Sequence, residues 1–406
     1  MKFGLFVAPF HKMGENPTLC YERDLETVEW AERLGFDEVF VGEHHSAGWE
    51  IIPSPELFIA NAAARTKRIR LGTGVVSIPY HHPLNVAARI AFLDHLTRGR
   101  IIFGVGPGLL PGDAYMRGIE PTEQRPRMIE GVKAIIRLFT EDKVTLDGSW
   151  FKLVDAHLQV KPFQRPYPPM VTASTFTPSG FMAAGQLGTG IMTFFTGGLT
   201  DLNARWKLAE EVAANNGRKL SRHEWRMVLP IHLAESRPEA MRQIRDWGNE
   251  YFREYAISTT GLAQKDSPDQ PLSEVTIDGL VNAGAMLIGT PDDAIAKIRE
   301  MNEAAGGIGG VLNMLMDWGT REQQLRSHEL MARYVMPVFQ GSADSIVYSN
   351  QWSRERRDVL TEKAAVGVAA AFAAAGQSAQ EVGAGERVAT HPASATKAAN
   401  GGKAAK

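Results

Sequence analysis

The stretch FGLFVAPFHKMGENPTLCYERDLETVEWAERLGFDEVFV, residues 3–41, contains one complete unit of the pattern that runs through the chain. Residues 3–10 form a short apolar run, which predicts a buried strand. Residues 21–34 carry apolar side chains at helical spacing and end at Gly35, a residue that commonly terminates helices. Residues 38–41 form a second apolar run. This order of strand, helix and strand predicts two parallel strands joined by a crossover.

The same alternation continues to residue 334. Further strands are predicted at residues 69–79, 101–105, 170–173, 191–195, 225–234 and 311–316, and helices at residues 55–66, 85–96, 123–140, 202–215, 238–255 and 321–334. Eight strands that alternate with helices place the chain in the α/β class. They favour a closed (β/α)8 TIM barrel, with an open sheet carrying extra strands as the alternative.

Three segments depart from this pattern. Residues 144–164 predict a hairpin, with Asp147-Gly148 as its turn. Residues 261–289 form an insertion before the last strand, and long insertions of this kind usually belong to a substrate lid or wall. The tail from about residue 364 to residue 406 is rich in Ala, Gly, Ser and Lys, which predicts disorder beyond a helix that ends before residue 375. We expect a barrel domain at residues 1–340 and a C-terminal extension at residues 341–406, partly helical and then disordered.

The composition narrows the class of partner. The net charge of the 406 residues is −2 and no basic stripe stands out, so a nucleic acid is not expected. The single cysteine, Cys20, cannot form a disulfide within the chain, which fits a reducing compartment. The sequence holds no apolar run of about 18 residues, so we expect no membrane span. A cytoplasmic protein with a small-molecule partner is the expectation.

Paired histidines follow two of the predicted strands. The active site of a barrel of this kind lies at the C-terminal ends of the strands. Glu43-His44-His45 follows the second strand, and residues 77–83, SIPYHHP, follow the third. In strand geometry His44 and His45 point in opposite directions, so one can face a pocket while the other packs behind it. The alternatives are structural histidines bonded to backbone carbonyls, or zinc ligation with Glu43, which is disfavoured because adjacent residues on one strand rarely share a metal.

Two further rim segments suggest a ligand. Residues 104–108, GVGPG, do not open a helix in an open sheet, so a dinucleotide fingerprint is not supported. Their glycines can let a planar ligand approach the backbone, or can simply serve the loop. Ser174, Thr175, Thr177 and Ser179 lead into a helix, and hydroxyls with free amides at a helix N-terminus suit a phosphate. Ordinary capping would account for one of these hydroxyls.

Large apolar side chains also gather near the strand ends. An apolar pocket selects hydrophobic substrates and keeps water away from unstable intermediates. Packing of the barrel core is the alternative explanation for a good part of them. The residues concerned are Phe10, Trp49, Tyr80, Phe176, Phe194, Phe195, Met314, Met316 and Trp318.

Taken in order, several of these segments resemble the bacterial-luciferase-like flavin monooxygenases. The resemblance covers residues 1 to about 340, and it rests on Met1–Phe6, Gly35-Phe36-Asp37, Glu43-His44-His45, Leu71-Gly72-Thr73, Pro79 through His82-Pro83, and Gly99-Arg100. Gly48-Trp49-Glu50 with Pro53, Pro55 and Glu56, and Gly104–Gly108, are more similar to the limonene and diketocamphane monooxygenase branch than to luciferase itself.

The resemblance implies an activity. It implies reduced FMN supplied by a separate, transiently bound flavin reductase, capture of O2 as a flavin hydroperoxide, and insertion of one oxygen atom into a hydrophobic, terpene-like small molecule. Epoxidation, hydroxylation and Baeyer–Villiger oxidation are all compatible with it. A homodimer is implied as well. The alternatives are a deazaflavin-dependent oxidoreductase that transfers hydride on the same barrel, and a non-catalytic flavin-binding protein.

The resemblance also implies roles for individual residues. It gives His44 proton transfer beside the flavin, for which a neutral imidazole with a pKa near 6.5 is suited. It places a non-prolyl cis peptide at Ser77–Pro79, and Pro107 stands where luciferase has an arginine near the phosphate, with Arg125 or Arg127 as substitutes. The cofactor residues are Ser77, Gly106, Pro107, Ser174 and Thr175, and the substrate-pocket residues are Phe10, Trp49, Tyr80, Phe195 and Trp318.

Overall fold

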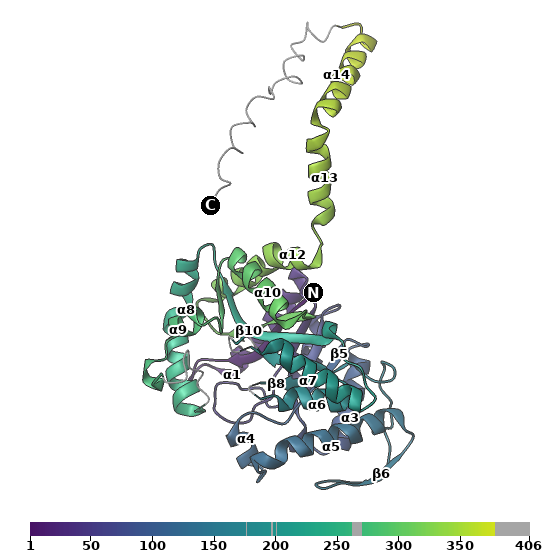
Figure 1. Cartoon of the computed structure of the whole chain (residues 1–406), viewed down its shortest axis with the longest axis vertical. Helices are drawn as coiled ribbons and strands as arrows, with labels where there is room; N and C mark the ends of the chain where they lie inside the picture. The colour runs from purple at the N-terminus through teal and green to yellow at the C-terminus, as the bar shows by residue number, and fades with distance from the viewer. Residues whose placement is uncertain (176, 196–197, 200, 262–269, 378–406) are drawn as a thin grey trace. The chain divides into compact units, whose positions relative to one another are not determined.

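A computed structural model of the chain describes residues 1–175, 177–195, 198–199, 201–261 and 270–377. In this part of the chain, eight parallel strands close into a barrel with helices outside it (Figure 1), which confirms the predicted (β/α)8 architecture. Each strand pairs with the next, and the last pairs with the first. The strands, in barrel order, are β1 (Lys2–Phe10), β2 (Glu38–Val41), β3 (Arg70–Thr73), β5 (Ile101–Gly106), β8 (Met170–Ser174), β9 (Gly190–Phe194), β10 (Trp225–Leu233) and β12 (Gly310–Met316).

Helices connect these strands, and the predicted ones are present with shifts of a few residues at their ends. The predicted helix at residues 202–215 has the same bounds in the structure. The helices are α1 (Pro17–Leu34), α2 (Pro55–Arg65), α3 (Pro83–Leu96), α4 (Pro111–Tyr115), α5 (Pro121–Thr140), α6 (Ser179–Leu187), α7 (Leu202–Asn215), α8 (Arg237–Tyr251), α9 (Ile277–Asn282), α10 (Pro291–Ala305), α11 (Arg321–Leu330) and α12 (Met336–Gln340). Short 3-10 or π turns are η1 (Ile78–Tyr80), η2 (Arg222–Glu224), η3 (Phe252–Thr259), η4 (Leu272–Glu274) and η5 (Met331–Val335).

The third predicted strand is broken in the structure. β3 ends at Thr73, and a two-residue strand, β4 (Val76–Ser77), then pairs with the end of β5. The Thr73 hydroxyl donates to the Gly104 carbonyl at 2.7 Å and accepts from the Gly104 amide at 2.8 Å. This side chain therefore takes both hydrogen bonds that the main chain of a continuing strand would make. The cis peptide expected at Ser77–Pro79 lies instead between Gly74 and Val75, within the break.

The barrel interior is closed at the N-terminal ends of its strands. Phe40, Ile102 and Leu312, which come from three different strands, are fully buried together. Burial of a side chain of this size contributes roughly 1.5–3 kcal/mol. Below them Glu38 at the start of β2 accepts from Arg226 of β10 across the barrel, with Nε–Oε1 and Nη2–Oε2 distances of 2.6 and 3.0 Å. A cavity can therefore form only toward the C-terminal ends of the strands.

The predicted excursions are present in part. Residues 144–164 contain the expected hairpin, whose strands β6 (Val144–Asp147) and β7 (Lys152–Ala156) are antiparallel. In the insertion before the last strand, β11 (Leu287–Gly289) pairs in parallel with the end of β10. We did not predict β11, because three residues are too few to show a strand pattern. Residues 262–269 of this insertion lie outside the described residues.

The chain divides into two compact units, and the first spans Met1–Gln340. The second begins at Gly341 and contains α13 (Asp344–Glu355) and α14 (Arg357–Ala374). The disorder that the tail composition predicts concerns mainly residues 378–406, which lie outside the described residues. Among the helices of the described residues, none combines the length and the apolar character needed to cross a membrane.

Candidate functional site

A cavity of about 390 Å³ opens at the C-terminal end of the barrel. Its wall is mainly apolar, with polar side chains gathered in two places. One polar group surrounds His44, and the other includes Arg125, Thr175 and Thr177. The apolar lining comprises Phe6, Ala8, Phe10, Val75, Leu109, Leu110, Ala173, Phe194, Phe195, Val228, Phe252, Ala256, Ala285, Met286, Met314 and Met316.

His44 lies between two carboxylates. Its Nδ1 atom is 3.3 Å from Oδ2 of Asp113, and its Nε2 atom is 3.2 Å from Oε2 of Glu50. Asp113 is held in place by the Ser46 hydroxyl, which donates to Oδ1 at 2.6 Å, and by the His45 amide at 3.1 Å. A neutral imidazole carries one N–H, so it would leave a lone pair facing one of the two carboxylates. The arrangement suits an imidazolium.

The pKa of His44 is shifted in the direction opposite to that which would favour the neutral imidazole that we expected. Burial lowers the pKa of His44, but the neighbouring charges of Glu50, Asp113 and Glu43 raise it by more, and the net shift is upward. The pKa of Asp113 is lowered: burial opposes this shift, and the hydrogen bonds from His44 and Ser46 outweigh it. The surroundings of His44 therefore favour the protonated ring more than those of a free histidine would.

Glu43 and His45 belong to a second cluster of polar side chains next to His44. Oε1 of Glu43 accepts from Nε2 of His45 at 2.8 Å and from Nε2 of His81 at 2.7 Å, and Oε2 accepts from the Ser77 amide at 2.7 Å. These ligand types could hold a metal, but the distances are those of hydrogen bonds that satisfy the carboxylate. The cluster ties the end of β2 to the segment after β4. His45 is thus bonded to a carboxylate, whereas our structural alternative had given it a backbone carbonyl.

The cavity also has a cationic corner around Arg125. Arg125 of α5 lines the cavity, and its buried Nη1 atom has no hydrogen-bond partner among the described residues. Burial alone lowers its pKa. The Ser174 hydroxyl is also buried without a partner, and it lies against Gly180 in the first turn of α6, a helix without a side-chain cap. Unpaired buried donors beside a helix N-terminus suit an anion.

Six of the eleven residues that we predicted for the site line the cavity. They are Phe10, His44, Ser77, Pro107, Thr175 and Phe195. Phe176, which we had also placed at the rim, lies outside the described residues.

Two predicted cofactor residues lie just behind the wall. A Cβ atom on Gly106 would be 2.4 Å from Cγ2 of Val75, so Val75 covers this glycine. Ser174 is 1% exposed, because it packs against the start of α6. Both sit next to residues that do line the cavity.

Three predicted substrate residues lie elsewhere. Trp49 is buried behind Tyr251 and Tyr255, with ring-centroid distances of 6.3 and 5.9 Å. Tyr80 accepts from Gln124 at 3.1 Å and is covered by the Arg117 guanidinium, 4.5 Å from its ring centroid. Trp318 lines a different cavity on the other side of the barrel wall.

Sequence analysis missed several residues of the site. Asp113 lies in α4, a five-residue helix too short to show a pattern. Tyr251 and Tyr255 were inside the helix predicted at residues 238–255, but no local signal shows that they face the cavity. Glu50 was noted only as part of a family segment, and its charge among apolar neighbours was the signal available.

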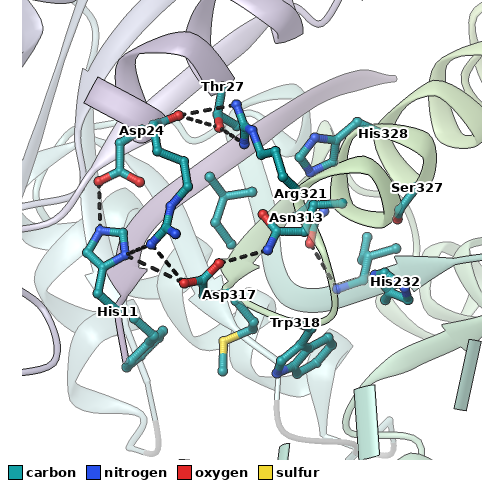
Figure 2. Close-up of a pocket in the computed structure, with 16 residues that line it drawn as sticks. His11, Asp24, Thr27, His232, Asn313, Asp317, Trp318, Arg321, Ser327 and His328 are labelled. Atoms are coloured by element: carbon teal, nitrogen blue, oxygen red, sulfur yellow. Dashed lines mark hydrogen bonds and ion pairs between the residues drawn. The ribbon is translucent and has the colours of Figure 1, made fainter. Parts of the chain in front are cut away.

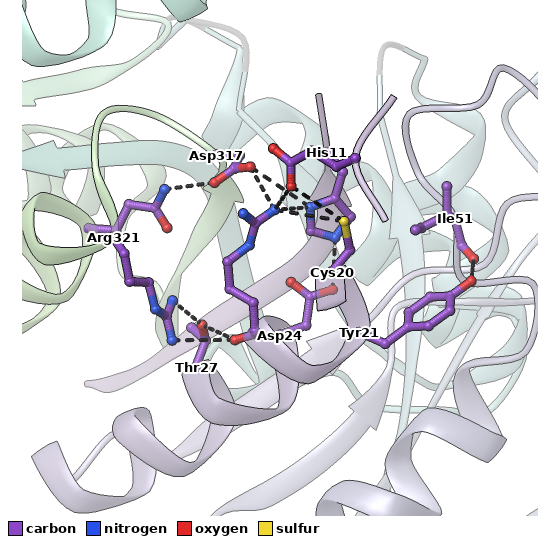
Figure 3. A network of polar contacts seen from close by, with 11 residues as sticks. His11, Cys20, Tyr21, Asp24, Thr27, Ile51, Asp317 and Arg321 are labelled. Atoms are coloured by element: carbon purple, nitrogen blue, oxygen red, sulfur yellow. Dashed lines mark hydrogen bonds and ion pairs between the residues drawn. The ribbon is translucent and has the colours of Figure 1, made fainter. Parts of the chain in front are cut away.

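The second cavity, of about 40 Å³, lies behind Phe10 and Met316 and is lined by charged side chains (Figure 2). His11, which follows β1, donates through Nε2 to Oδ2 of Asp24 on α1 at 3.0 Å. Arg23 bonds both Nδ1 of His11 and Oδ2 of Asp317, each at 2.8 Å (Figure 3). These groups join α1 to the end of β12, where the barrel closes. The small volume and the paired charges indicate a structural network.

Comparisons with known proteins identify the family of the chain. The model of the family described as luciferase-like monooxygenase matches residues 1–307. The 4-hydroxyprotoasukamycin monooxygenase of Streptomyces nodosus subsp. asukaensis is 42% identical over 364 residues, which are 88% of this chain and 97% of that protein. The limonene 1,2-monooxygenase of Rhodococcus erythropolis is 43% identical over 343 residues, 84% of this chain and 87% of that protein.

A solved structure supports the fold. The oxygenating constituent of 3,6-diketocamphane monooxygenase from Pseudomonas putida, in complex with FMN, has a TM-score of 0.71 at 23% identity and covers 83% of this chain and 98% of its own. Fold, cavity and relatives together define a flavin-dependent monooxygenase. The chain belongs to the luciferase-like monooxygenase family.

Proposed function

We propose that the chain is the oxygenase component of a two-component system. It takes reduced FMN from a separate reductase and uses O2 to insert one oxygen atom into a hydrophobic, terpene-like small molecule. The observation that carries this proposal is the cavity itself, which combines an unpaired cationic corner, an apolar wall and the His44 site in one space. The name of one relative above gives limonene, a terpene, as its substrate, which supports this substrate class; the name of the other gives 4-hydroxyprotoasukamycin.

The residues present fit FMN. Arg125, Thr175 and the first turn of α6 would hold its phosphate, because this corner offers a cation whose buried Nη1 atom has no hydrogen-bond partner among the described residues, and helix amides without a side-chain cap. Arg125 thereby supplies the positive charge near the phosphate that is missing at Pro107, where luciferase has an arginine. Val75 and Leu109 line the same cavity as His44 and would contact the ring system of the flavin. When bound, reduced FMN supplies the electrons that activate O2.

The chain's own residues then set the conditions for oxygen insertion. Phe6, Phe194 and Met314 keep water out of the cavity. His44 holds a proton between Asp113 and Glu50, at the boundary of the cavity, where it can be given to a developing negative charge. A substrate that lacks polar groups over most of its surface matches the lining.

The test combines binding and turnover. Titration of the protein with FMN should quench flavin fluorescence, and addition of reduced FMN, O2 and limonene or another apolar alkene or ketone should give a product that carries one ¹⁸O atom from ¹⁸O2. A parallel reaction with reduced deazaflavin and no O2 tests hydride transfer. Product in the deazaflavin arm alone would replace this proposal with the hydride-transfer alternative. Binding without turnover in either arm over a broad panel would favour a non-catalytic flavin-binding protein.

We also propose a homodimer. Leu57 on α2 and Phe92 and Leu96 on α3 are exposed, and these two helices are neighbours on the outside of the barrel. Apolar side chains that gather on adjacent helices commonly mark a protein contact. Light scattering should give the mass of two chains, and Phe92→Glu should reduce it to that of one. A wild-type mass of one chain at micromolar concentration would remove the proposal. The buried Cys20 fits the cytoplasmic location expected from the sequence, which stays a prediction.

A further inference from the structure

We propose that Glu50 is a positioning residue of the His44 site, which holds His44 and Tyr255 at the same time and so couples the segment after α8 to the imidazole. This inference rests on the proposed role of His44 in oxygen insertion. It adds two residues, from distant parts of the chain, to the group that controls the proton in the cavity.

The Glu50 carboxylate contacts two different residues. Its Oε2 atom lies 3.2 Å from Nε2 of His44, and its Oε1 atom accepts from the Tyr255 hydroxyl at 2.5 Å. The side chain is 6% exposed and lines the cavity. Each oxygen therefore has a different partner, and neither bond can break without leaving a buried charge short of a donor.

The loop that carries Glu50 has an unusual backbone conformation. Ala47 and Gly48 both adopt positive φ, 72° and 75°, which turns the chain back on itself. For Ala47, which carries a Cβ atom, this left-handed conformation is unfavourable. The returning strand is pinned, because Glu50 pairs with Phe10 and the His44 amide donates to the Ile52 carbonyl at 3.1 Å. The strained backbone of this loop places the Glu50 carboxylate against His44. Backbone strain of this kind clusters at functional sites.

His44 is surrounded by acidic side chains. The titratable groups that face His44 are Glu50 and Glu43 from the segment after β2, and Asp113 from α4. Tyr255 faces it only through Glu50. His44 is the basic side chain paired with both Glu50 and Asp113. Burial and the charge of Glu50 raise the pKa of Tyr255 well above its usual range, so the hydroxyl stays a donor at every working pH.

Tyr255 is part of the aromatic wall of the cavity. The residue lies in η3, directly after α8, and its ring packs against Phe10 and Tyr251 with centroid distances of 5.1 and 5.3 Å. Tyr251, Tyr255 and Phe10 all line the cavity. A substrate that displaces this wall would move Tyr255 relative to Glu50 and would thereby change how firmly the carboxylate holds the imidazole.

The experiment is an NMR titration of His44, identified by the signal that is lost in His44→Gln. In Glu50→Gln, which keeps the shape of the side chain, we expect the titration midpoint of His44 to fall by about one pH unit or more. Glu56→Gln is the matched control, since Glu56 is also buried but pairs with Arg89 and Ser54. It should leave the midpoint unchanged. Equal midpoints in Glu50→Gln and Glu56→Gln would overturn the proposal.

Tyr255→Phe completes the test and replaces Glu50→Gln if that variant does not fold. Without the hydroxyl, the buried Glu50 carboxylate loses its second donor, so its hold on the imidazole changes and the His44 midpoint should shift. An unchanged midpoint would contradict the coupling. The titration needs neither flavin nor substrate, so its outcome is separate from that of the proposed function. If the midpoints shift but no oxygenation is found, only the proposed function fails.

Discussion

Two histidines of this molecule have similar partners and different surroundings. His44, after β2, lies between Asp113 and Glu50, and His11, after β1, lies between Asp24 and Asp317. His44 faces a cavity of about 390 Å³, whereas His11 faces one of about 40 Å³. The His11 network also contains Arg23, which balances its acids. An imidazole between two carboxylates is therefore not by itself evidence of catalysis.

The two regions differ in whether their charged groups are paired and in whether free space remains beside them. Around His11, each charged partner named above contacts a group of opposite charge, and the network joins α1 to β12. Around the large cavity, Arg125 keeps a donor without a partner, and the apolar wall leaves room for a ligand. Nε1 of Trp318 and Nδ1 of His328, beside the small cavity, also lack partners among the described residues, but neither group is charged. Space for a ligand beside an unpaired cation, rather than the histidine, therefore distinguishes the functional region from the structural one.

The strongest way to break the comparison is to remove the imidazole at His44. We expect His44→Gln to lower the rate of product formation by about 10²–10⁴-fold, the usual contribution of a positioned acid or base. FMN binding and the circular dichroism spectrum should stay close to wild type, because the ring contacts the cavity and not the core. Rates are measured with saturating reduced FMN and substrate. A rate within a factor of two of wild type would remove His44 from the mechanism.

A second comparison uses two arginines of α5. Arg125 has an unpaired nitrogen in the cavity, while Arg127 pairs with Glu123 at 2.8 Å. A hydrogen bond to a charged group is worth roughly 1.5–3 kcal/mol, so Arg125→Gln should weaken FMN binding by about 10- to 100-fold. Arg127→Gln should change it little. Fluorescence titration measures both affinities. Equal losses in the two variants would mean that the helix, and not the cavity cation, binds the cofactor.

The structural histidine should show the opposite phenotype. His11→Gln removes the donor of Asp24, a buried acid, and should lower the free energy of unfolding by about 1–3 kcal/mol. Urea titration measures this change. Turnover per folded molecule should stay within about twofold of wild type at a temperature where the variant is folded. A large loss of turnover at unchanged stability would mean that the small cavity takes part in the chemistry.

The sequence predicted the barrel far better than the site. Each barrel strand lies in a short segment rich in apolar residues, so the pattern is local and all eight strands were found. The site depends on contacts between distant residues. Asp113 meets His44 across 69 positions, and Tyr255 meets Glu50 across 205. Trp49 and Trp318 were misplaced because their residue type says that they are buried but not on which side of the wall. Only coordinates decide that.

The smallest expected effect is the pH dependence that His44 gives to stability. Its pKa is raised in the folded protein, so its contribution to stability is fully present below its unfolded value of about 6.5 and is lost as the pH rises through the folded pKa. His44→Gln should therefore lower the melting temperature more at pH 6 than at pH 9. His157→Gln, at an exposed histidine, should give a difference from wild type that is the same at both values. A His44→Gln effect that is equal at pH 6 and pH 9 would show that Glu50 and Asp113 do not hold a proton on the ring.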